Sequence, residues 1–187
     1  PKSKADLAFT MHILSWLAVN GTAAIVEFPG VMYRGGTEAK IRKYLIDNNY
    51  VDAVIQLPPD LFFGTTIATC ILVLKKSKPM NDVVFIDASA EFTRSGNKNK
   101  LTSDHQQRIL DAFIARADID HFAKVVPNGE IAERDYLMSV SSYVEAEDTR
   151  VATDIKALNA EIAEIVKRQS ELRTAIDEIV ADLEASA

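Results

Sequence analysis

Two neighbouring phenylalanines, Phe62 and Phe63, are the side chains whose type and position most suggest chemistry in this sequence. They lie between two apolar runs, 51–57 and 67–74, which are rich in β-branched residues and bounded by Pro and Gly, a pattern that predicts two buried strands. An aromatic ring held at the mouth of a sheet can stack on a flat ligand such as a nucleobase. The alternative, that both rings cap the hydrophobic core, is the more common arrangement. The residues alone leave both interpretations open.

Cys70 and His12 are the other candidates for reactive or metal-binding groups. Cys70 is the only cysteine and has no basic neighbour, which predicts a small core side chain rather than a nucleophile. A lone cysteine excludes an intrachain disulfide and fits a reducing, cytoplasmic setting. His12 falls in a wide apolar band that includes Phe9 and Trp16, so we expect a packed imidazole and no metal site.

The elements that would position these side chains follow an α/β order. Apolar periodicity predicts helices over Lys4–Ala18 and Glu38–Asn48, the first buried along its whole apolar band. The continuous apolar run Thr22–Phe28 has the pattern of a central parallel strand. Alternating helices and strands favour a parallel sheet, but run 67–74 follows run 51–57 after too few residues for a helical crossover. We therefore expect those two strands to be antiparallel.

The next part of the chain is less regular. Residues 82–88 predict a further strand at the sheet edge, and residues 93–103 predict a polar, mobile connection. A helix is expected over 104–116, with an inward face made of Ile109, Leu110, Phe113 and Ile114. Beyond it, Pro127-Asn128-Gly129 is typical of a hairpin turn.

From Val151 onward the chain contains no Gly or Pro, and nine residues recur at alternating steps of three and four. This heptad seam consists of Ile155, Leu158, Ile162, Ile165, Gln169, Leu172, Ile176, Ile179 and Leu183. Such spacing predicts a helix that supercoils with a partner helix, and the polar Gln169 would set register or partner choice. Self-association and docking onto another protein explain the seam equally well, and packing against the chain's own domain explains it less well.

The composition excludes two broad classes of protein. No apolar run in the 187 residues approaches the roughly 20 needed to span a bilayer. The net charge of −6 arises entirely after residue 144, and the rest of the chain is neutral, so a basic nucleic-acid-binding surface is not expected.

Several motifs together resemble the modification subunit of type I restriction–modification systems. These are Leu57-Pro58-Pro59-Asp60-Leu61-Phe62-Phe63-Gly64-Thr65-Thr66-Ile67 with the strand that follows, Gly30-Val31-Met32-Tyr33-Arg34-Gly35-Gly36, Phe85-Ile86-Asp87-Ala88-Ser89, and Asp135-Tyr136-Leu137-Met138-Ser139-Val140-Ser141-Ser142-Tyr143-Val144. The last departs from the family pattern, which usually has Asn where this chain has Leu137. The resemblance covers nearly the whole chain.

The resemblance implies the second half of a class I S-adenosylmethionine-dependent methyltransferase fold, a mixed α/β sheet with an antiparallel strand, followed by a long coiled-coil-type helix. It divides the chain into the methyltransferase portion 1–92, a connecting segment 93–146 and the heptad helix 147–187. Because the chain begins with Pro1 rather than Met, we expect a portion of a longer protein.

The resemblance also implies an activity, methylation of adenine N6 in DNA. By family position, Phe62, with Phe63 as the alternative, would stack on the flipped base, and Asp6 and Phe9 would touch S-adenosylmethionine. The Gly-rich cofactor turn and the Asn/Asp-Pro-Pro-aromatic loop are missing from this sequence. No catalytic residue is therefore expected in the chain, and the chain alone should be inactive.

The implied partners are DNA, the specificity subunit, the restriction subunit and a possible second modification subunit. In this family the C-terminal helix packs with helices of the specificity subunit. The competing hypothesis is a non-enzymatic assembly module, a small α/β domain that only presents the heptad helix.

Overall fold

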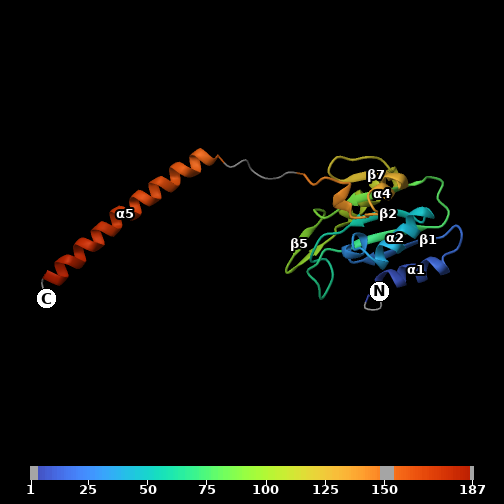
Figure 1. The fold of residues 1–187 in the computed structure, drawn as a ribbon, viewed down its shortest axis with the longest axis horizontal. Helices are drawn as coiled ribbons and strands as arrows, with labels where there is room; N and C mark the ends of the chain where they lie inside the picture. Colours follow the sequence, from blue (N-terminus) through green and yellow to red (C-terminus); the bar gives the residue numbers. More distant parts are fainter. Residues whose placement is uncertain (1–3, 148–153, 186–187) are drawn as a thin grey trace. The chain divides into compact units, whose positions relative to one another are not determined.

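The computed structural model describes residues 4–147 and 154–185, which form two compact units (Figure 1). The first unit ends at Glu147, and the second contains the helix α5, Ile155–Ala185. The predicted beginning of the long helix at 151–153 lies outside the described residues. No helix within the described ranges is long and apolar enough to cross a membrane.

The first unit alternates helices and strands along the chain. Its elements are α1 (Asp6–Trp16), β1 (Thr22–Glu27), the 3-10 helix η1 (Pro29–Met32), α2 (Thr37–Asp47), β2 (Val51–Gln56), β3 (Cys70–Lys75), β4 (Asp82–Asp87), β5 (Thr93–Ser95), β6 (Lys98–Lys100), α3 (Ser103–Ala115), β7 (Ala123–Pro127), α4 (Asn128–Glu133) and the 3-10 helix η2 (Val140–Ser142).

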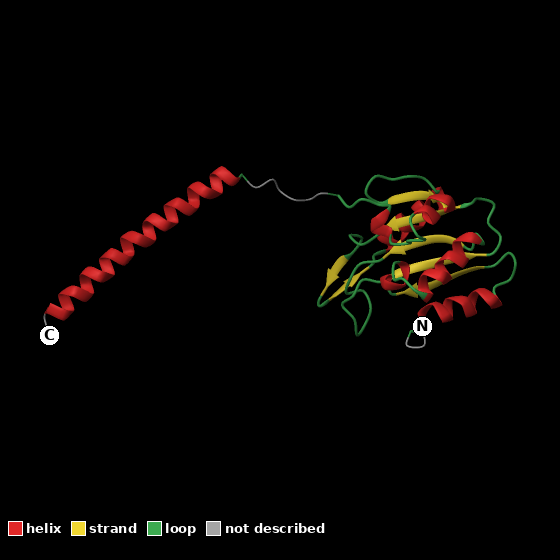
Figure 2. Ribbon diagram, viewed as in Figure 1, coloured by secondary structure: helices red, strands yellow, loops and turns green. Residues whose placement is uncertain are grey.

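Five strands form one mixed sheet in the order β1-β3-β2-β4-β7 (Figure 2). β3 is antiparallel to both β1 and β2, so β1 and β2 run in the same direction with β3 inserted between them. β4 pairs parallel with β2, and β7 pairs antiparallel with β4. The predicted antiparallel relation of β2 and β3 is confirmed.

Helices cover both faces of this sheet. On one face, residues of α1, α2 and α4 pack with inward side chains of β2, β3 and β4, and Phe85 at the centre of β4 is fully buried. Its ring stacks on Tyr143, with 4.3 Å between centroids. On the other face, α3 packs through Ala112, Ile109 and Phe113 against the alternate residues of the same strands. The alternating direction of strand side chains thus builds two separate cores.

The prediction that Thr22–Phe28 is a central strand is wrong. Within the described residues β1 pairs with β3 alone, and alternate residues along it are exposed. A continuous apolar run shows that a strand is hydrophobic on both faces, but it does not specify which strands lie beside it.

Residues 82–88 were predicted at an edge, but β4 lies inside the sheet because β7 pairs with its outer side. The hairpin turn predicted at 127–129 is absent, since Asn128 begins α4. Asn128 is buried, and its side-chain amide donates to the carbonyl of Ile46. This hydrogen bond, rather than a turn, explains the presence of an asparagine at position 128.

The segment 93–103 was predicted to be a mobile connection, but it contains the ordered two-stranded hairpin β5–β6, which turns at Gly96 with φ +60°. In the helix that follows, Leu110 and Ile114 are exposed, contrary to prediction, while Ile109 and Phe113 pack on the sheet. The division of residues 1–146 at position 92 stays a prediction, although β7 and α3 belong to the same compact unit as β1–β4.

Helix α1 is buried on one side only. Leu7 and Leu14 belong to the core, whereas Phe9 is 64% and Trp16 81% exposed. The predicted burial of the whole apolar band is therefore wrong for its outer half. Residues three and four apart share a helix face, so Phe9, His12 and Trp16 form one exposed stripe.

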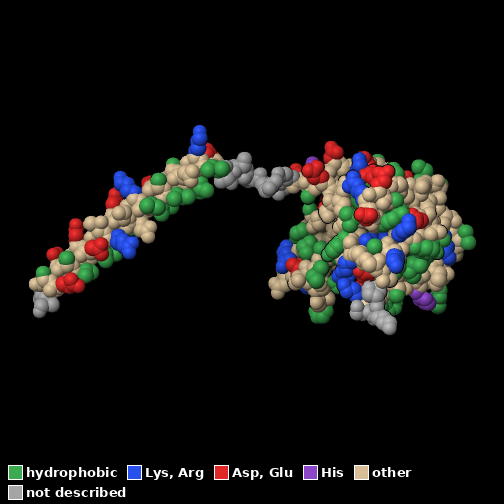
Figure 3. Space-filling model, in the orientation of Figure 1, with side chains coloured by type: hydrophobic (Ala, Val, Ile, Leu, Met, Phe, Trp, Pro, Cys, Tyr) green, Lys and Arg blue, Asp and Glu red, His purple; other side chains and the backbone are tan. Residues whose placement is uncertain are grey.

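Helix α5 carries no buried residue in its described length. All eight apolar seam residues of the heptad are exposed, and Figure 3 shows hydrophobic side chains on this helix between acidic and basic ones. A strongly apolar stripe exposed along 31 residues is unusual for a helix that has no partner.

Candidate functional site

The carboxyl ends of β1, β2 and β4 meet at one edge of the sheet. Strand pairing places Glu27, Cys70, Gln56 and Asp87 side by side in a row across that edge, where β3 begins. In open α/β sheets, ligands bind in the crevice outside the carboxyl ends of the strands. A ligand-binding site is therefore expected among the segments that follow or precede these strand ends.

The loop 57–69, which joins β2 to β3, leaves from this row and carries both phenylalanines. The Phe62 side chain is 38% exposed and Phe63 is 101% exposed, so the alternative in which both rings cap the core does not hold for Phe63. A fully exposed Phe on a sheet edge leaves both ring faces available for stacking on a flat ligand.

The backbone of this loop is held in place by the β5–β6 hairpin. The ammonium of Lys98 donates to the carbonyls of Phe62 and Thr65, at 2.9 and 2.8 Å. Asn99, which is buried, donates its side-chain amide to the carbonyl of Pro59 and its backbone N–H to the carbonyl of Asp60. The loop thus has exposed aromatic side chains on a restrained backbone.

The first turns of α1 lie at the same edge, because Thr10 on α1 donates a hydrogen bond to the Glu27 carboxyl group at the end of β1. Asp6 and Phe9 are three residues apart and share one face of this helix, and Phe9 is exposed. Since β1 and β2 are two strand spacings apart, the end of β1 lies about 10 Å from the start of the phenylalanine loop. The structure therefore brings Asp6 and Phe9 to the same sheet edge as Phe62 and Phe63.

Glu27 was not singled out from the sequence, although an acidic residue in an otherwise apolar strand was a visible signal. It is 5% exposed, and burial raises the pKa of its carboxyl group, with the nearby Asp6 charge adding to the effect and the Thr10 hydrogen bond opposing it. Burial of a carboxyl group favours its neutral form, because the charged form loses its contact with water.

We expect Glu27→Gln to stabilise the fold at pH 8 and to have little effect at pH 4. The pKa of Glu27 in the folded chain is raised above its ordinary value of 4.5. Between the unfolded-state and folded-state pKa values, the folded chain therefore binds more protons than the unfolded chain. The free energy of unfolding falls as pH rises through that interval. Glutamine removes the charge and still accepts the Thr10 hydrogen bond. Urea unfolding at both pH values measures the difference, and a variant less stable at pH 8 than the parent would contradict the expectation.

Cys70 has the structural role that the sequence predicts, whereas His12 lies on the exposed side of α1 and is not packed within a buried apolar band. The Cys70 thiol is buried, and burial, together with the Glu27 charge, raises its pKa to about 12. A thiol in that state is a poor nucleophile. His12 is exposed and packs on Trp16, with 5.0 Å between ring centroids. In the two described ranges, no group of three or more His, Cys, Asp or Glu side chains could hold a metal ion.

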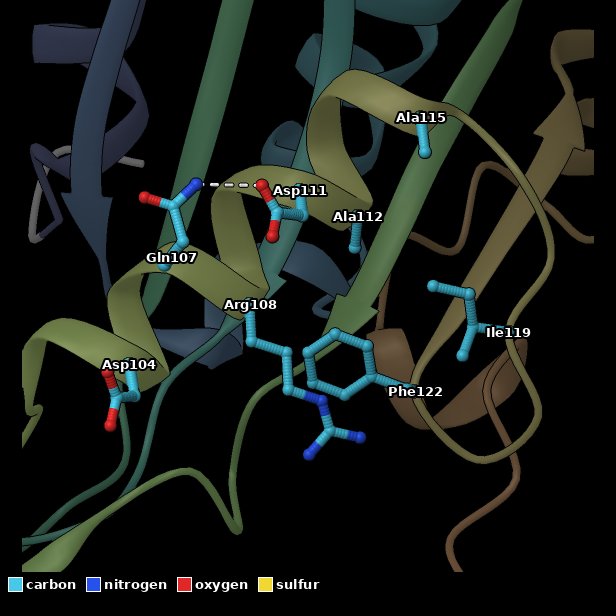
Figure 4. Close-up of a pocket in the computed structure, with 8 residues that line it drawn as sticks. All are labelled: Asp104, Gln107, Arg108, Asp111, Ala112, Ala115, Ile119 and Phe122. Atoms are coloured by element: carbon cyan, nitrogen blue, oxygen red, sulfur yellow. Dashed lines mark hydrogen bonds between the residues drawn. The ribbon is translucent and has the colours of Figure 1, made fainter.

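A hollow of about 420 Å³ lies elsewhere, between α3 and the segment that carries Ile119 and Phe122 (Figure 4). Three of its polar side chains have partners within the chain: Gln107 donates to Asp111 at 2.7 Å, and Arg108 pairs with Glu91 while lying 4.2 Å from the Phe122 ring centroid. Neither the phenylalanine loop nor α1 contributes to its lining. We assign it no role in the site.

The chain matches the family described as N-6 DNA Methylase over residues 1–152. It is 50% identical to the type I restriction enzyme MpnII methylase subunit of Mycoplasma pneumoniae, covering 98% of this chain and 34% of that protein. It is 32% identical to the MjaVII methylase subunit of Methanocaldococcus jannaschii, covering 98% of this chain and 32% of that protein. The chain thus spans about a third of the length of these relatives.

Among solved structures, the chain is similar to the methyltransferase subunit of a type I restriction–modification system from Streptococcus thermophilus. The TM-score is 0.76 at 44% identity, over 78% of this chain and 31% of that one. The mixed sheet, with β3 inserted antiparallel between β1 and β2, is the second half of a class I methyltransferase fold, and α5 is the long helix that follows it. From the family match over 152 residues and the 50% identity to a type I methylase subunit, we conclude that this chain belongs to the N-6 DNA methylase family.

Proposed function

We propose that this chain forms the part of a type I methylase subunit that holds the target adenine outside the DNA helix. An enzyme that modifies a base inside a duplex must extrude it, and the extruded base is commonly stacked on an aromatic side chain. Phe62 would be this platform, with Phe63 as the alternative. The observation that carries the proposal is the exposure of both rings on a loop whose backbone is restrained at the carboxyl edge of the sheet.

S-adenosylmethionine would be the methyl donor, and its adenine rim fits the surface that Asp6 and Phe9 share. A carboxylate can accept a hydrogen bond from an adenine amino group, and an exposed ring can pack on the base. When bound, the cofactor supplies an electrophilic methyl group. This chain's contribution is to bind the rim of the cofactor and to orient the acceptor base. A cytoplasmic location belongs to the same proposal.

The 187 residues alone are expected to be inactive, because the sequence contains neither a Gly-rich cofactor turn nor an Asn/Asp-Pro-Pro-aromatic loop. Incubation of the isolated chain with DNA and radiolabelled S-adenosylmethionine measures this directly. Incorporation of label into adenine above the no-enzyme background would contradict the expectation.

Helix α5 would dock onto helices of the specificity subunit, which selects the DNA sequence. The apolar seam is exposed over its whole described length, and residues at heptad spacing typically pack against a partner helix in a coiled coil. DNA, the restriction subunit and a second methylase subunit complete the proposed assembly.

The exposed seam also favours a second candidate function, that of an assembly module without a part in catalysis. In that case the α/β unit would only present α5, and Phe62 and Phe63 would have no catalytic consequence. The two candidates differ in what they predict for the loop 57–69.

Replacing Phe62 with alanine in the longer methylase subunit, assembled with its specificity subunit, separates them. Loss of base stacking costs about 1–3 kcal/mol, so we expect methylation of the cognate duplex to slow by roughly 5- to 150-fold while the complex still forms. Phe63→Ala tests the alternative platform, and Ile67→Ala, another exposed apolar residue of the same loop, is the control. Unchanged methylation by both Phe variants would favour the assembly module.

A further inference from the structure

The β5–β6 hairpin makes an unusual set of contacts with the phenylalanine loop. Two residues of β6 donate hydrogen bonds to four backbone carbonyls of the loop, which are those of Pro59, Asp60, Phe62 and Thr65. Two of these bonds come from one ammonium group, that of Lys98. Both acceptors of Lys98 belong to the four-residue turn that contains Phe62, Phe63 and Gly64, so the lysine links the first and last residues of that turn.

The second residue, Asn99, fixes the beginning of the loop. It is 6% exposed, and three of its polar groups have partners: its backbone N–H and side-chain amide donate to the loop, and its side-chain oxygen accepts from Arg94 at 3.1 Å. Arg94 also pairs with the carboxylate of Asp60 at 3.2 Å. Asp60 has φ +55°, a conformation that a non-glycine residue keeps only when its surroundings hold it.

We propose that the β5–β6 hairpin positions the aromatic platform, with Lys98 as the positioning residue. This inference rests on the proposed function of the loop. A ring attached to a free loop would lose conformational entropy each time it stacked on a base, whereas a loop held in advance loses less. Lys98 touches neither base nor cofactor in this account, and acts only through the backbone of Phe62 and Thr65.

A basic hairpin also suggests a different role, attraction of DNA phosphates, since residues 93–103 contain three basic and no acidic side chains. The contacts argue against it for Lys98, whose ammonium is directed to two carbonyls of its own chain. Lys100 is the matched comparison, because it lies on the same strand, carries the same charge and is exposed. Losing either lysine removes one positive charge, but only loss of Lys98 removes the support of the turn.

The test compares Lys98→Met, Lys98→Arg and Lys100→Met in the longer methylase subunit assembled with its specificity subunit, with saturating cognate DNA and S-adenosylmethionine. We expect Lys98→Met to lower the methylation rate about tenfold, because the turn is then no longer held in advance and must be ordered each time the ring stacks on the base. Lys98→Arg, which keeps a charged donor, should recover part of the rate, and Lys100→Met should match the parent. Equal losses in Lys98→Met and Lys100→Met, both relieved at low salt, would overturn the proposal in favour of phosphate attraction.

A double-mutant cycle with Phe62→Ala gives a readout that general destabilisation of the chain would not give. If Lys98 acts through the ring, the double variant should be hardly slower than Phe62→Ala alone, and multiplied losses would overturn the inference. The same cycle with Phe63→Ala covers the alternative platform. If Lys98→Met melts below the assay temperature, all variants are compared at a lower temperature at which circular dichroism shows Lys98→Met to be folded.

Different results would overturn the proposed platform and the proposed role of the hairpin. Parental rates for both Phe62→Ala and Phe63→Ala would remove the proposed function itself, whatever Lys98 does. A slow Phe62→Ala variant combined with a parental Lys98→Met rate would leave the platform in place and remove only the role of the hairpin.

Discussion

Replacing Phe85 with alanine is expected to lower the free energy of unfolding by about 3–5 kcal/mol, a large part of the stability of a domain of this size. Phe85 is fully buried at the centre of β4, the strand that joins β2 to β7, and its ring stacks on Tyr143. Alanine would leave a cavity lined by strand residues that cannot close over it, and would remove the stacking partner of Tyr143. Urea unfolding followed by circular dichroism measures the change.

Phe63→Ala is the matched control, because it removes the same ring from a fully exposed position. Its expected effect on stability is within about 0.5 kcal/mol, as for other surface substitutions. The pair also separates stability from function, since Phe63 lies in the proposed site and Phe85 does not. Equal unfolding midpoints for the two variants would contradict the described packing of β4.

Replacing Ile162 with aspartate on α5 is expected to abolish binding to the specificity subunit while the α/β unit stays folded. Ile162 lies in the middle of the first half of the seam and is exposed, so the change costs the free chain little. In a helix–helix interface the same carboxylate would be buried without a partner, at a cost of several kcal/mol. Ile176→Asp, two heptads further on, should act in the same way. Gel filtration of the mixed subunits measures the complex.

Ala160→Asp is the control for this pair. It adds the same charge to the same helix, two residues before Ile162 and on the face away from the seam. We expect it to leave complex formation intact. A complex that forms equally with Ile162→Asp and Ala160→Asp would show that the seam is not the docking surface.

Much of the fold could be predicted because the local patterns are strong. The β-branched runs at 51–57 and 67–74, separated by too short a connection for a crossover, predict an antiparallel pair, and the structure has it. The heptad seam predicts a long helix, which α5 confirms. The order of strands in the sheet was harder to predict, since no local feature of residues 123–127 shows that they add a fifth strand beside β4. That omission is why β4 was expected at an edge.

In the candidate site, too, the residues with a local sequence signal could be predicted, and those whose role depends on long-range contacts could not. The phenylalanines stand out in the sequence because two aromatic rings in a loop are conspicuous, and family position adds Asp6 and Phe9. Lys98 and Asn99 did not stand out, because a polar Gly/Asn/Lys-rich segment is typical of a mobile connection. Their role depends on hydrogen bonds to a loop more than 30 residues earlier in the chain, and such long-range contacts leave no periodic trace in the sequence.

A ring of the loop 57–69 is proposed to stack on an extruded adenine. The most direct test measures methylation by the assembled parent enzyme and its Phe62→Ala variant on two duplexes, one with the target adenine paired and one with an abasic site opposite it. Extrusion costs less when the base has no pairing partner, so the rate should then depend less on stacking. We expect the rate deficit of Phe62→Ala to shrink several-fold on the unpaired substrate, and Phe63→Ala to show this behaviour if Phe63 is the platform. A deficit that is the same on both duplexes would contradict it.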